Sequence, residues 1–225
     1  MDRRVLEVID LGRCDYDAAW ARQKEFHARI VADPASPPYL ILVEHPPVIT
    51  LGRRADRANV LLSAAELAER GVQLREVDRG GDVTYHGPGQ LVAYPIMRLS
   101  GKRRDVHSYF RSLEQVTIDL LAEYGITAGR QEGLTGVWVG DEKICAMGVA
   151  IKRWITYHGL ALNVSTDLDH FRLITPCGIV GKGITSLAKL LGRHVPLEQV
   201  AEKLVRHFAA EFGFSDLTPS APAQN

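Results

Sequence analysis

The amino-acid sequence predicts an α+β fold with a mixed, mainly antiparallel sheet flanked by helices. Short apolar segments separated by turn residues occur in groups along the chain, as in meandering strands. Only a few longer segments show the helical spacing of apolar residues, and they stand between these groups. Because single strands do not alternate with single helices, the pattern disfavours a doubly wound parallel sheet.

The 225 residues, 46% of them hydrophobic, are enough to bury one core. We therefore expect a single domain over residues 1–214. The last segment, residues 215–225, is polar and contains proline, so we expect it to be a disordered tail.

Several segments have the composition of strands. Residues 39–43 are almost continuously apolar, and two prolines separate them from residues 48–51, so two adjacent strands are expected. A Gly-Pro-Gly turn at residues 87–89 lies between two further strands, and a Gly-Asp turn at residues 140–141 predicts a hairpin. The expected strands are residues 5–11, 39–43, 48–51, 72–77, 82–86, 90–95, 137–139, 144–151 and 155–164.

Four helices are expected, each with a start signal. Asp15 and Asp105 can cap the first and third helices, and Ser63 begins a capping box with Glu66. Pro196 is a favoured first-turn residue for the last helix. These helices are expected to end near residues 31, 70, 124 and 212.

Charge and composition disfavour several classes of function. With 27 basic and 27 acidic residues the formal charge is zero, so no overall field gathers nucleic acid. The sequence shows neither a signal peptide nor an apolar run that could span a bilayer, and we expect a cytoplasmic protein without membrane association. The three cysteines have neither disulfide nor zinc-site spacing, so no metal site is expected.

The segment from Arg79 to Gln90, RGGDVTYHGPGQ, is the densest functional signal. It holds four glycines and a proline among polar and aromatic residues, and glycines at this density let the backbone approach a ligand closely. Its spacing fits neither the P-loop nor the dinucleotide fingerprint. The alternative is a structural hairpin with tight turns, which is favoured for residues 87–89 taken alone.

Two further segments combine a strand pattern with small residues. Residues 136–148 place Lys143 at the start of a strand, and residues 158–164 form another strand with small residues at intervals. Small residues on adjacent strands can form the floor of a narrow channel. For His158 we expect an ordinary, fully hydrogen-bonded strand histidine, with an orienting role as the alternative; the role of His86 stays open.

Cys177 lies in the turn Thr175-Pro176-Cys177-Gly178, 34 residues after Lys143. A thiol with an ordinary pKa of about 8.5 is mostly protonated at neutral pH, and the thiolate is the nucleophile. A lysine about 4 Å away could lower the thiol pKa by about two units or more before solvent screening. Taken alone, the pair is weak evidence, since a small buried cysteine is an equally good interpretation.

Together, and in this order, these segments resemble the motifs of the lipoyl(octanoyl) transferases over roughly residues 40–190. The resemblance implies the fold of the biotin/lipoate protein ligases, which is similar to that of class II aminoacyl-tRNA synthetases. It implies an acyltransferase that moves octanoyl from acyl carrier protein to a lysine of lipoyl domains. Those domains belong to the E2 subunits of 2-oxo acid dehydrogenases and to the glycine cleavage H protein, and the step begins the synthesis of protein-bound lipoate.

The resemblance also assigns residues. Cys177 matches the residue that forms the acyl thioester, and Lys143 matches the lysine that lowers its pKa. One departure is Cys145, a second thiol two positions from Lys143 and, in a regular strand, on the same face. We favour Cys177 as the nucleophile and expect Cys14 to be structural. The implied substrate-contacting residues are Arg79, Gly80, Gly81, Asp82, Val83, Thr84, Tyr85, His86, Ala146, Met147, Gly148, Gly159, Leu160 and Ala161.

The implied mechanism is a double displacement through the enzyme thioester. A thioester already carries its activation, so no cofactor, nucleotide or metal is expected, and we expect a monomer. Two related enzymes remain as alternatives: an ATP-dependent lipoate-protein ligase, which needs no nucleophilic cysteine, and an amidotransferase that moves octanoate between lipoyl-carrying proteins. A non-enzymatic module that binds lipoyl domains or carrier protein is the third alternative.

Overall fold

The computed structural model describes residues 4–101, 104–175 and 182–220. Its strands are β1 (Val5–Arg13), β2 (Tyr39–Glu44), β3 (Val48–Leu51), β4 (Gln73–Glu76), β5 (Val83–His86), β6 (Gln90–Ile96), β7 (Gly129–Gln131), β8 (Leu134–Val139), β9 (Glu142–Lys152), β10 (Ile155–Asn163), β11 (Gly183–Ile184) and β12 (Asp216–Ser220). Its helices are α1 (Tyr16–Ala32), α2 (Ala64–Glu69), α3 (Val106–Ala122), α4 (Leu187–Leu191) and α5 (Leu197–Phe212), with the short 3-10 helices η1 (Arg57–Asn59) and η3 (Leu168–Leu173).

The centre of the protein is a large sheet with the strand order β12-β1-β2-β6-β10-β9-β8-β7, and β11 pairs beside β9. Neighbouring strands run antiparallel from β2 through to β7. The pairs β12–β1, β1–β2 and β11–β9 are parallel. The expectation of an α+β fold with a mixed, mainly antiparallel sheet is therefore confirmed.

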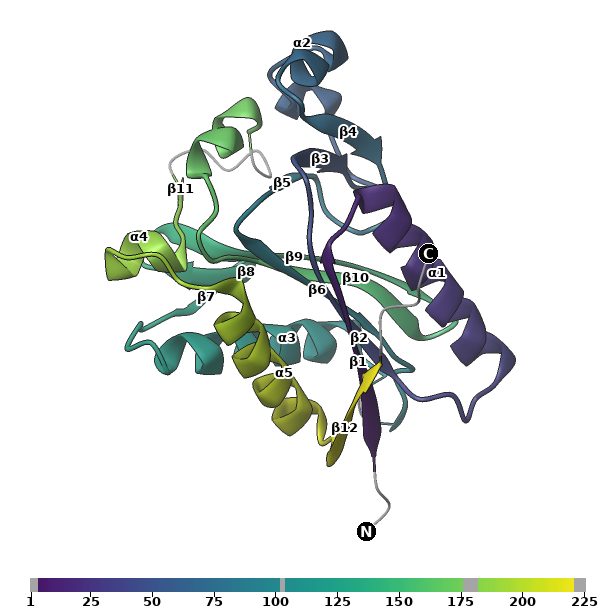
Figure 1. Ribbon diagram of the computed structural model, residues 1–225. Helices are drawn as coiled ribbons and strands as arrows, with labels where there is room; N and C mark the ends of the chain where they lie inside the picture. The colour runs from purple at the N-terminus through teal and green to yellow at the C-terminus, as the bar shows by residue number, and fades with distance from the viewer. Residues whose placement is uncertain (1–3, 102–103, 176–181, 221–225) are drawn as a thin grey trace.

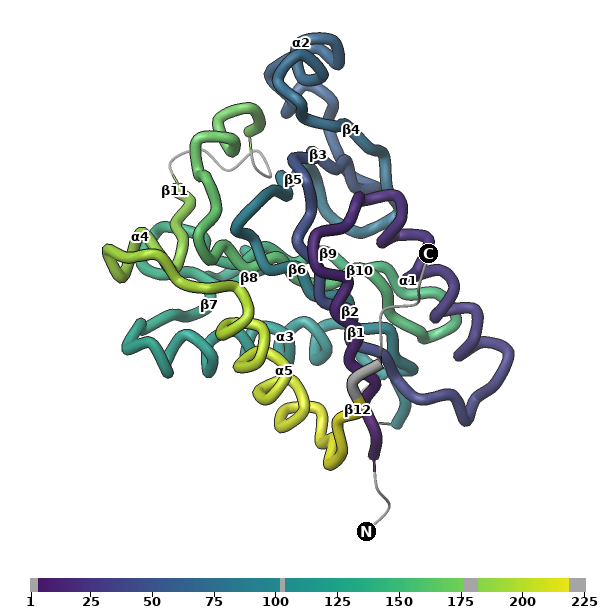
Figure 2. The backbone as a smooth tube through the Cα atoms, viewed as in Figure 1, coloured from purple at the N-terminus to yellow at the C-terminus, as the bar shows by residue number. Residues whose placement is uncertain are grey.

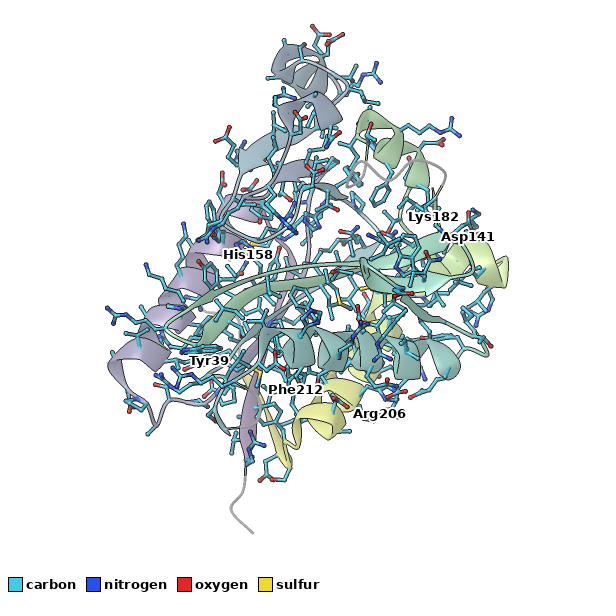
Figure 3. The ribbon with its side chains drawn as sticks, turned by 180° about the vertical axis from the view of Figure 1, so that it is seen from behind. Tyr39, Asp141, His158, Lys182, Arg206 and Phe212 are labelled. Atoms are coloured by element: carbon cyan, nitrogen blue, oxygen red, sulfur yellow. The ribbon has the colours of Figure 1, made fainter. Side chains whose placement is uncertain are left out.

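Helices cover both faces of the large sheet (Figure 1). On one face α3 and α5 pack against each other and the sheet, with the Tyr109 and Phe212 rings 5.9 Å apart. On the opposite face, called here the α1 face, the ring of Phe26 in α1 lies 4.3 Å from that of Tyr39 in β2. Figure 3 labels Tyr39 near α1 and Phe212 near α5. Within the described part of the chain, no helix combines the length and apolarity needed to cross a membrane.

The predicted helix starts are present. Asp15 and Asp105 accept hydrogen bonds from the backbone N–H groups two residues later, and Ser63 forms the capping box with Glu66. Pro196 is the N-cap of α5, whose buried side chains recur at helical spacing. Gly213 ends α5 in the left-handed conformation, with φ of +71°.

A second, three-stranded sheet with the order β4-β3-β5 lies on the same side of the large sheet as α1 (Figure 1). The expectation that β2 and β3 are adjacent strands is wrong, because β2 belongs to the large sheet and β3 to the small one. Likewise, the Gly-Pro-Gly turn at residues 87–89 does not close a hairpin. It carries the chain from β5 in the small sheet to β6 in the large sheet.

The expectation of a disordered tail from residue 215 is wrong for residues 216–220. These residues form β12, which pairs in parallel with β1 at the edge of the large sheet. Figure 2 shows this segment of the tube beside the N-terminal strand. Residues 221–225 lie outside the described residues.

Candidate active site

A cavity of about 770 Å³ lies along β9 and β10, between the large sheet, the residue 79–84 segment and the start of α3. Nearly all of the predicted site residues line it. From the glycine-rich segment these are Arg79, Gly80, Gly81, Asp82, Val83, Thr84 and His86, and from β9 and β10 they are Lys143, Ala146, Met147, Gly148, Gly159, Leu160 and Ala161. Three segments far apart in the sequence therefore meet at one site.

Small residues form the floor of this cavity on two neighbouring strands. Ala146 of β9 pairs with Ala161 of β10, and Gly148 pairs with Gly159. A side chain at Gly159 would lie only 2.2 Å from the carbonyl oxygen of Ala93 in β6, so only glycine fits there. The sequence analysis predicted that small residues on adjacent strands form the floor of a narrow channel, and these four residues form such a floor.

The glycine-rich segment lies directly against the edge of β9. The N–H of Gly80 donates to the carbonyl oxygen of Val149 at 2.8 Å. A Cβ at Gly148 would be 3.1 Å from the Gly80 carbonyl oxygen, so the two backbones meet at glycines. This close contact joins two parts of the chain, and the approach of the backbone to a ligand stays a prediction.

Arg79 holds this segment against the small sheet. Its guanidinium is buried and donates to the carbonyl oxygen of Thr50 at 2.7 Å and to the Thr50 hydroxyl at 2.9 Å. It also donates to the carbonyl oxygen of Gly80 at 3.0 Å. A buried cation with several oxygen acceptors is a rigid anchor, which explains why a turn segment carries an arginine.

Lys143 stands at the start of β9, and its ammonium nitrogen lies 4.8 Å from the centre of the Trp138 ring on β8. Gly136 on β8 packs closely against β9, because a Cβ there would be 2.5 Å from the carbonyl oxygen of Cys145 and in contact with the aliphatic stem of Lys143. Among the described residues, no carboxylate pairs with this ammonium group. The cavity therefore contains a positive charge available to a ligand or to a neighbouring anion.

Cys177 lies outside the described residues, but the chain on both sides of residues 176–181 is described. The Thr175 N–H donates to the carbonyl oxygen of Asn59 at 2.8 Å. On the other side β11 pairs with the first two residues of β9, placing Ile184 opposite Lys143. Lys182 forms an ion pair with Asp141, and both are labelled in Figure 3.

Cys145 does not share the face of Lys143. A register shift between Val137 and Trp138 interrupts the regular alternation, so the expectation that the two lie on one face is wrong. The Cys145 side chain is fully buried on the α3 side, with its sulfur 3.9 Å from the Thr117 hydroxyl. Burial raises its pKa to about 12, and Cys145 does not line the cavity.

Cys14 packs against the core of the α1 face, away from the cavity. Burial also raises the pKa of this thiol, and the neighbouring Asp15 carboxylate adds to the shift. Neither described cysteine therefore has the setting of a nucleophile.

A chain of side-chain hydrogen bonds crosses the cavity wall. His86 donates through Nδ1 to Oε1 of Gln90 at 2.8 Å, and the Gln90 amide donates to Oδ1 of Asn163 at 2.9 Å. The Asn163 amide donates to the carbonyl oxygen of Thr185 at 3.1 Å, next to β11. Burial lowers the pKa of His86 to about 3, so this imidazole is neutral at physiological pH.

His158 lines the cavity and is hydrogen-bonded to Asp78, which does not itself line it. Nε2 of His158 lies 2.9 Å from Oδ1 of Asp78, and the Tyr157 hydroxyl donates to Oδ2 at 2.5 Å. The hydrogen bond from His158 holds the pKa of Asp78 well below its usual range, while burial lowers the pKa of His158. The expectation that His158 is fully hydrogen-bonded is wrong, because its Nδ1 has no partner among the described residues.

Of the described residues predicted to contact substrate, only Tyr85 does not line the cavity. Its ring is buried in the core of the small sheet, where it stacks on the His170 ring with 5.1 Å between the two ring centres. Sequence reasoning missed three residues of this region. Asp78 stands one residue before the glycine-rich segment. Tyr16 and Tyr94 line the cavity, but in the sequence they stand out only by their apolar character. The described residues contain no group of three or more His, Cys, Asp or Glu that could hold a metal ion.

The sequence matches the family model of the lipoyl protein ligase A/B catalytic domain over residues 15–209. It is 51% identical to an octanoyltransferase from Chloroflexus aggregans, covering 96% of this chain and 97% of that protein. It is 50% identical to an octanoyltransferase from Solibacter usitatus, covering 94% of each.

Solved structures share the fold at low sequence identity. A crystal structure of lipoate-protein ligase A bound with ATP superimposes with a TM-score of 0.74 at 18% identity, covering 100% of this chain and 90% of that one. The biotin protein ligase from Aquifex aeolicus gives a TM-score of 0.52 at 9% identity, covering 92% of this chain and 69% of the other. The chain therefore belongs to the lipoyl protein ligase A/B catalytic domain family and, within it, to the octanoyltransferases.

Proposed function

We propose that this protein moves an octanoyl group from octanoyl-acyl carrier protein to a lysine of lipoyl domains through a thioester on Cys177. Octanoyl transfer follows from membership of the octanoyltransferase family. The carrier-protein donor, the thioester and the acceptors are our proposal. The acceptors are the lipoyl domains of 2-oxo acid dehydrogenase E2 subunits and the glycine cleavage H protein, served by a cytoplasmic monomer.

The observation that carries the proposal is the position of Lys143. Its ammonium group lies in a cavity floored by small residues and has no carboxylate partner among the described residues. β11, which follows the segment that contains Cys177, pairs with β9 at Lys143 itself. A cation at this place supports a thiolate on Cys177, because a neighbouring positive charge favours the ionised thiol.

The proposed chemistry has two displacements. In the first, the Cys177 thiolate forms a bond to the octanoyl carbonyl carbon, and the bond from that carbon to the pantetheine sulfur breaks. Lys143 gives its proton to the leaving thiolate. In the second, the acceptor lysine amine forms the amide bond, the bond to the Cys177 sulfur breaks, and the neutral Lys143 accepts the amine proton.

We place the octanoyl chain in the acyl channel, defined as the space over Ala146, Gly148, Gly159 and Ala161. Burying its methylenes at roughly 0.8 kcal/mol each contributes about 5 kcal/mol, enough to position the thioester. Because a thioester is already an activated acyl group, the proposed reaction uses no nucleotide or other cofactor.

Intact-protein mass spectrometry after mixing with octanoyl-acyl carrier protein, without ATP, tests the proposal. We expect one octanoyl adduct on the wild type that hydroxylamine removes, and none on Cys177→Ser. Cys145→Ser is the matched control and should acylate like the wild type. A hydroxylamine-sensitive adduct that persists in Cys177→Ser would exclude Cys177 as the nucleophile.

Two further reactions separate the related enzyme classes. Modification of a lipoyl domain that requires ATP and free octanoate, with no enzyme adduct, would identify a ligase. Transfer from an octanoylated H protein but not from carrier protein would identify an amidotransferase. Binding of lipoyl domain that survives Cys177→Ser, without turnover of any donor, would identify a binding module.

A further inference from the structure

The backbone of β10 is irregular at His158, where φ is +56°. Residues other than glycine rarely adopt positive φ, and such strain persists only where surrounding contacts impose it. Consecutive side chains of a regular strand point to opposite faces, yet Tyr157 and His158 both bond the carboxylate of Asp78. The irregular backbone therefore turns His158 toward the α1 face, where Figure 3 labels it beside α1.

The contacts around His158 fix its orientation but leave one nitrogen unused. Its backbone N–H donates to Oε1 of Gln23 in α1 at 2.7 Å, and the side chain is 1% exposed. Since the Asp78 carboxylate can only accept, Nε2 carries the ring proton of the neutral imidazole. Nδ1 is then a buried acceptor with no partner among the described residues, a feature that calls for a physical explanation.

His158 stands directly after the floor of the acyl channel. The pairs Ala146–Ala161 and Gly148–Gly159 are followed by Val149–His158, and His158 lines the cavity. The small floor residues therefore give way to an imidazole at one end. The opposite end lies near Asn163, which bonds Thr185, whose N–H in turn donates to the Lys143 carbonyl oxygen.

The length of the floor suits an acyl chain of about eight carbons. From Asn163 to Gly159 the strand covers four residues, or about 13 Å. With carbon–carbon bonds of roughly 1.5 Å in a zigzag, an extended octanoyl chain is about 9 Å long and a dodecanoyl chain about 14 Å. An octanoyl methyl group therefore ends before Gly159, whereas a dodecanoyl chain reaches His158.

We propose that His158, held by Asp78 and Tyr157, closes the acyl channel and discriminates against acyl chains longer than octanoyl. A longer chain places methylene groups against Nδ1, so that this nitrogen can accept a hydrogen bond from no donor. Leaving a buried acceptor without a hydrogen bond costs free energy and therefore weakens the binding of the longer chain. The inference rests on the proposed function, because it takes the channel to hold the acyl group.

The test compares octanoyl and dodecanoyl substrates on His158→Phe, which keeps a ring and removes both nitrogens. We expect the ratio of kcat/KM for dodecanoyl over octanoyl transfer to rise about tenfold. His170→Phe is the matched control, since His170 stacks on Tyr85 outside the cavity, and its ratio should equal that of the wild type. His158→Leu, which also lacks the nitrogens, serves if His158→Phe does not fold.

Calorimetry of octanoate and dodecanoate binding to the same variants measures chain-length preference without turnover. We expect the same shift toward the longer acid in both His158 variants. Folded His158 variants whose transfer and binding ratios stay within twofold of the wild type would overturn the inference. A wild type that forms no thioester but prefers octanoate, with that preference lost in His158→Phe, would refute the proposed function and leave the end wall standing.

Discussion

The ammonium nitrogen of Lys143 lies 4.8 Å from the ring centre of Trp138 on the neighbouring strand. A cation over an indole face gains about 0.5–2 kcal/mol, depending on its burial. Replacing Trp138 with Leu removes this attraction and lets the lysine leave the cavity. We expect the rate of Cys177 acylation by octanoyl-acyl carrier protein to fall about threefold to tenfold. Intact-protein mass spectrometry of samples quenched at successive times measures this rate.

Trp138→Phe is the matched variant, because it keeps an aromatic face at the same position. It should acylate faster than Trp138→Leu. Equal rates for both variants, at equal thermal stability, would show that the ring only fills space.

Cys145 is expected to be chemically inert. Burial raises the pKa of Cys145 to about 12, so almost all of this thiol is protonated at pH 8. After brief treatment of the folded protein with iodoacetamide at pH 8, peptide mapping should find Cys177 alkylated and Cys145 unmodified. The same treatment in urea should label all three cysteines, Cys145 included, which is the positive control.

Acid should destabilise the fold through buried neutral histidines. Burial lowers the pKa of His45 to about 4 and that of His86 to about 3, against about 6.5 in the unfolded chain. Below pH 6.5 the unfolded chain therefore binds protons that the folded chain does not. The stability contribution of each group is complete above pH 6.5 and decreases as the pH falls toward 4, by up to about 1.4 kcal/mol per unit per histidine.

Urea unfolding at pH 7.5, 6.5 and 5.5 measures this dependence. We expect little change between the first two values and a clear loss of unfolding free energy at pH 5.5. His45→Asn removes one of the two groups, so the slope of its stability below pH 6.5 should be smaller. A wild-type stability that is constant down to pH 5.5 would contradict the prediction.

The carboxylate of Glu114 is buried beneath β8 and joins two elements of the site. It accepts from Arg111 at 2.8 Å, from Arg130 at 2.9 Å and from the N–H of Gly136 at 3.2 Å. Glu114→Ala should reduce the unfolding free energy by about 2 kcal/mol, because it leaves partly buried donors without an acceptor. Glu114→Gln keeps an acceptor for Gly136 and should cost less.

Glu123 provides the comparison for this measurement. Like Glu114 it has three partners, here the basic side chains of Lys203, Arg206 and His207, but at the exposed surface. Exposed ion pairs contribute little, so Glu123→Ala should be clearly milder than Glu114→Ala in urea unfolding. A reversed order would show that burial of Glu114 does not determine its contribution.

Much of the fold could be predicted from local signals. Apolar runs locate the inner strands, and Asp15, Ser63 and Asp105 mark helix starts, since each signal acts within a few residues. The assignment of β3 to a separate sheet depended on contacts that no local pattern reports. β12 was missed because its polar residues and Pro219 are compatible with an edge strand only when β1 lies beside them.

Part of the candidate site could also be predicted from local signals, and part depended on tertiary contacts. Glycines, alanines and a lysine in three separate motifs indicated a channel, and the structure places them around one cavity. The role of His158 could not be read from the sequence, because it depends on a positive φ and on Asp78, which is 80 residues earlier in the chain. The separation of Cys145 from Lys143 likewise depends on one register shift between strands.

The position of β12 has a practical consequence for handling this protein. A chain shortened to end at residue 214 would lose the strand that covers β1 and would present a row of unpaired backbone groups to solvent. Such open edges template pairing between molecules. A truncated version should therefore oligomerise or precipitate, and an affinity tag should be attached so that residues 216–220 stay intact and paired with β1.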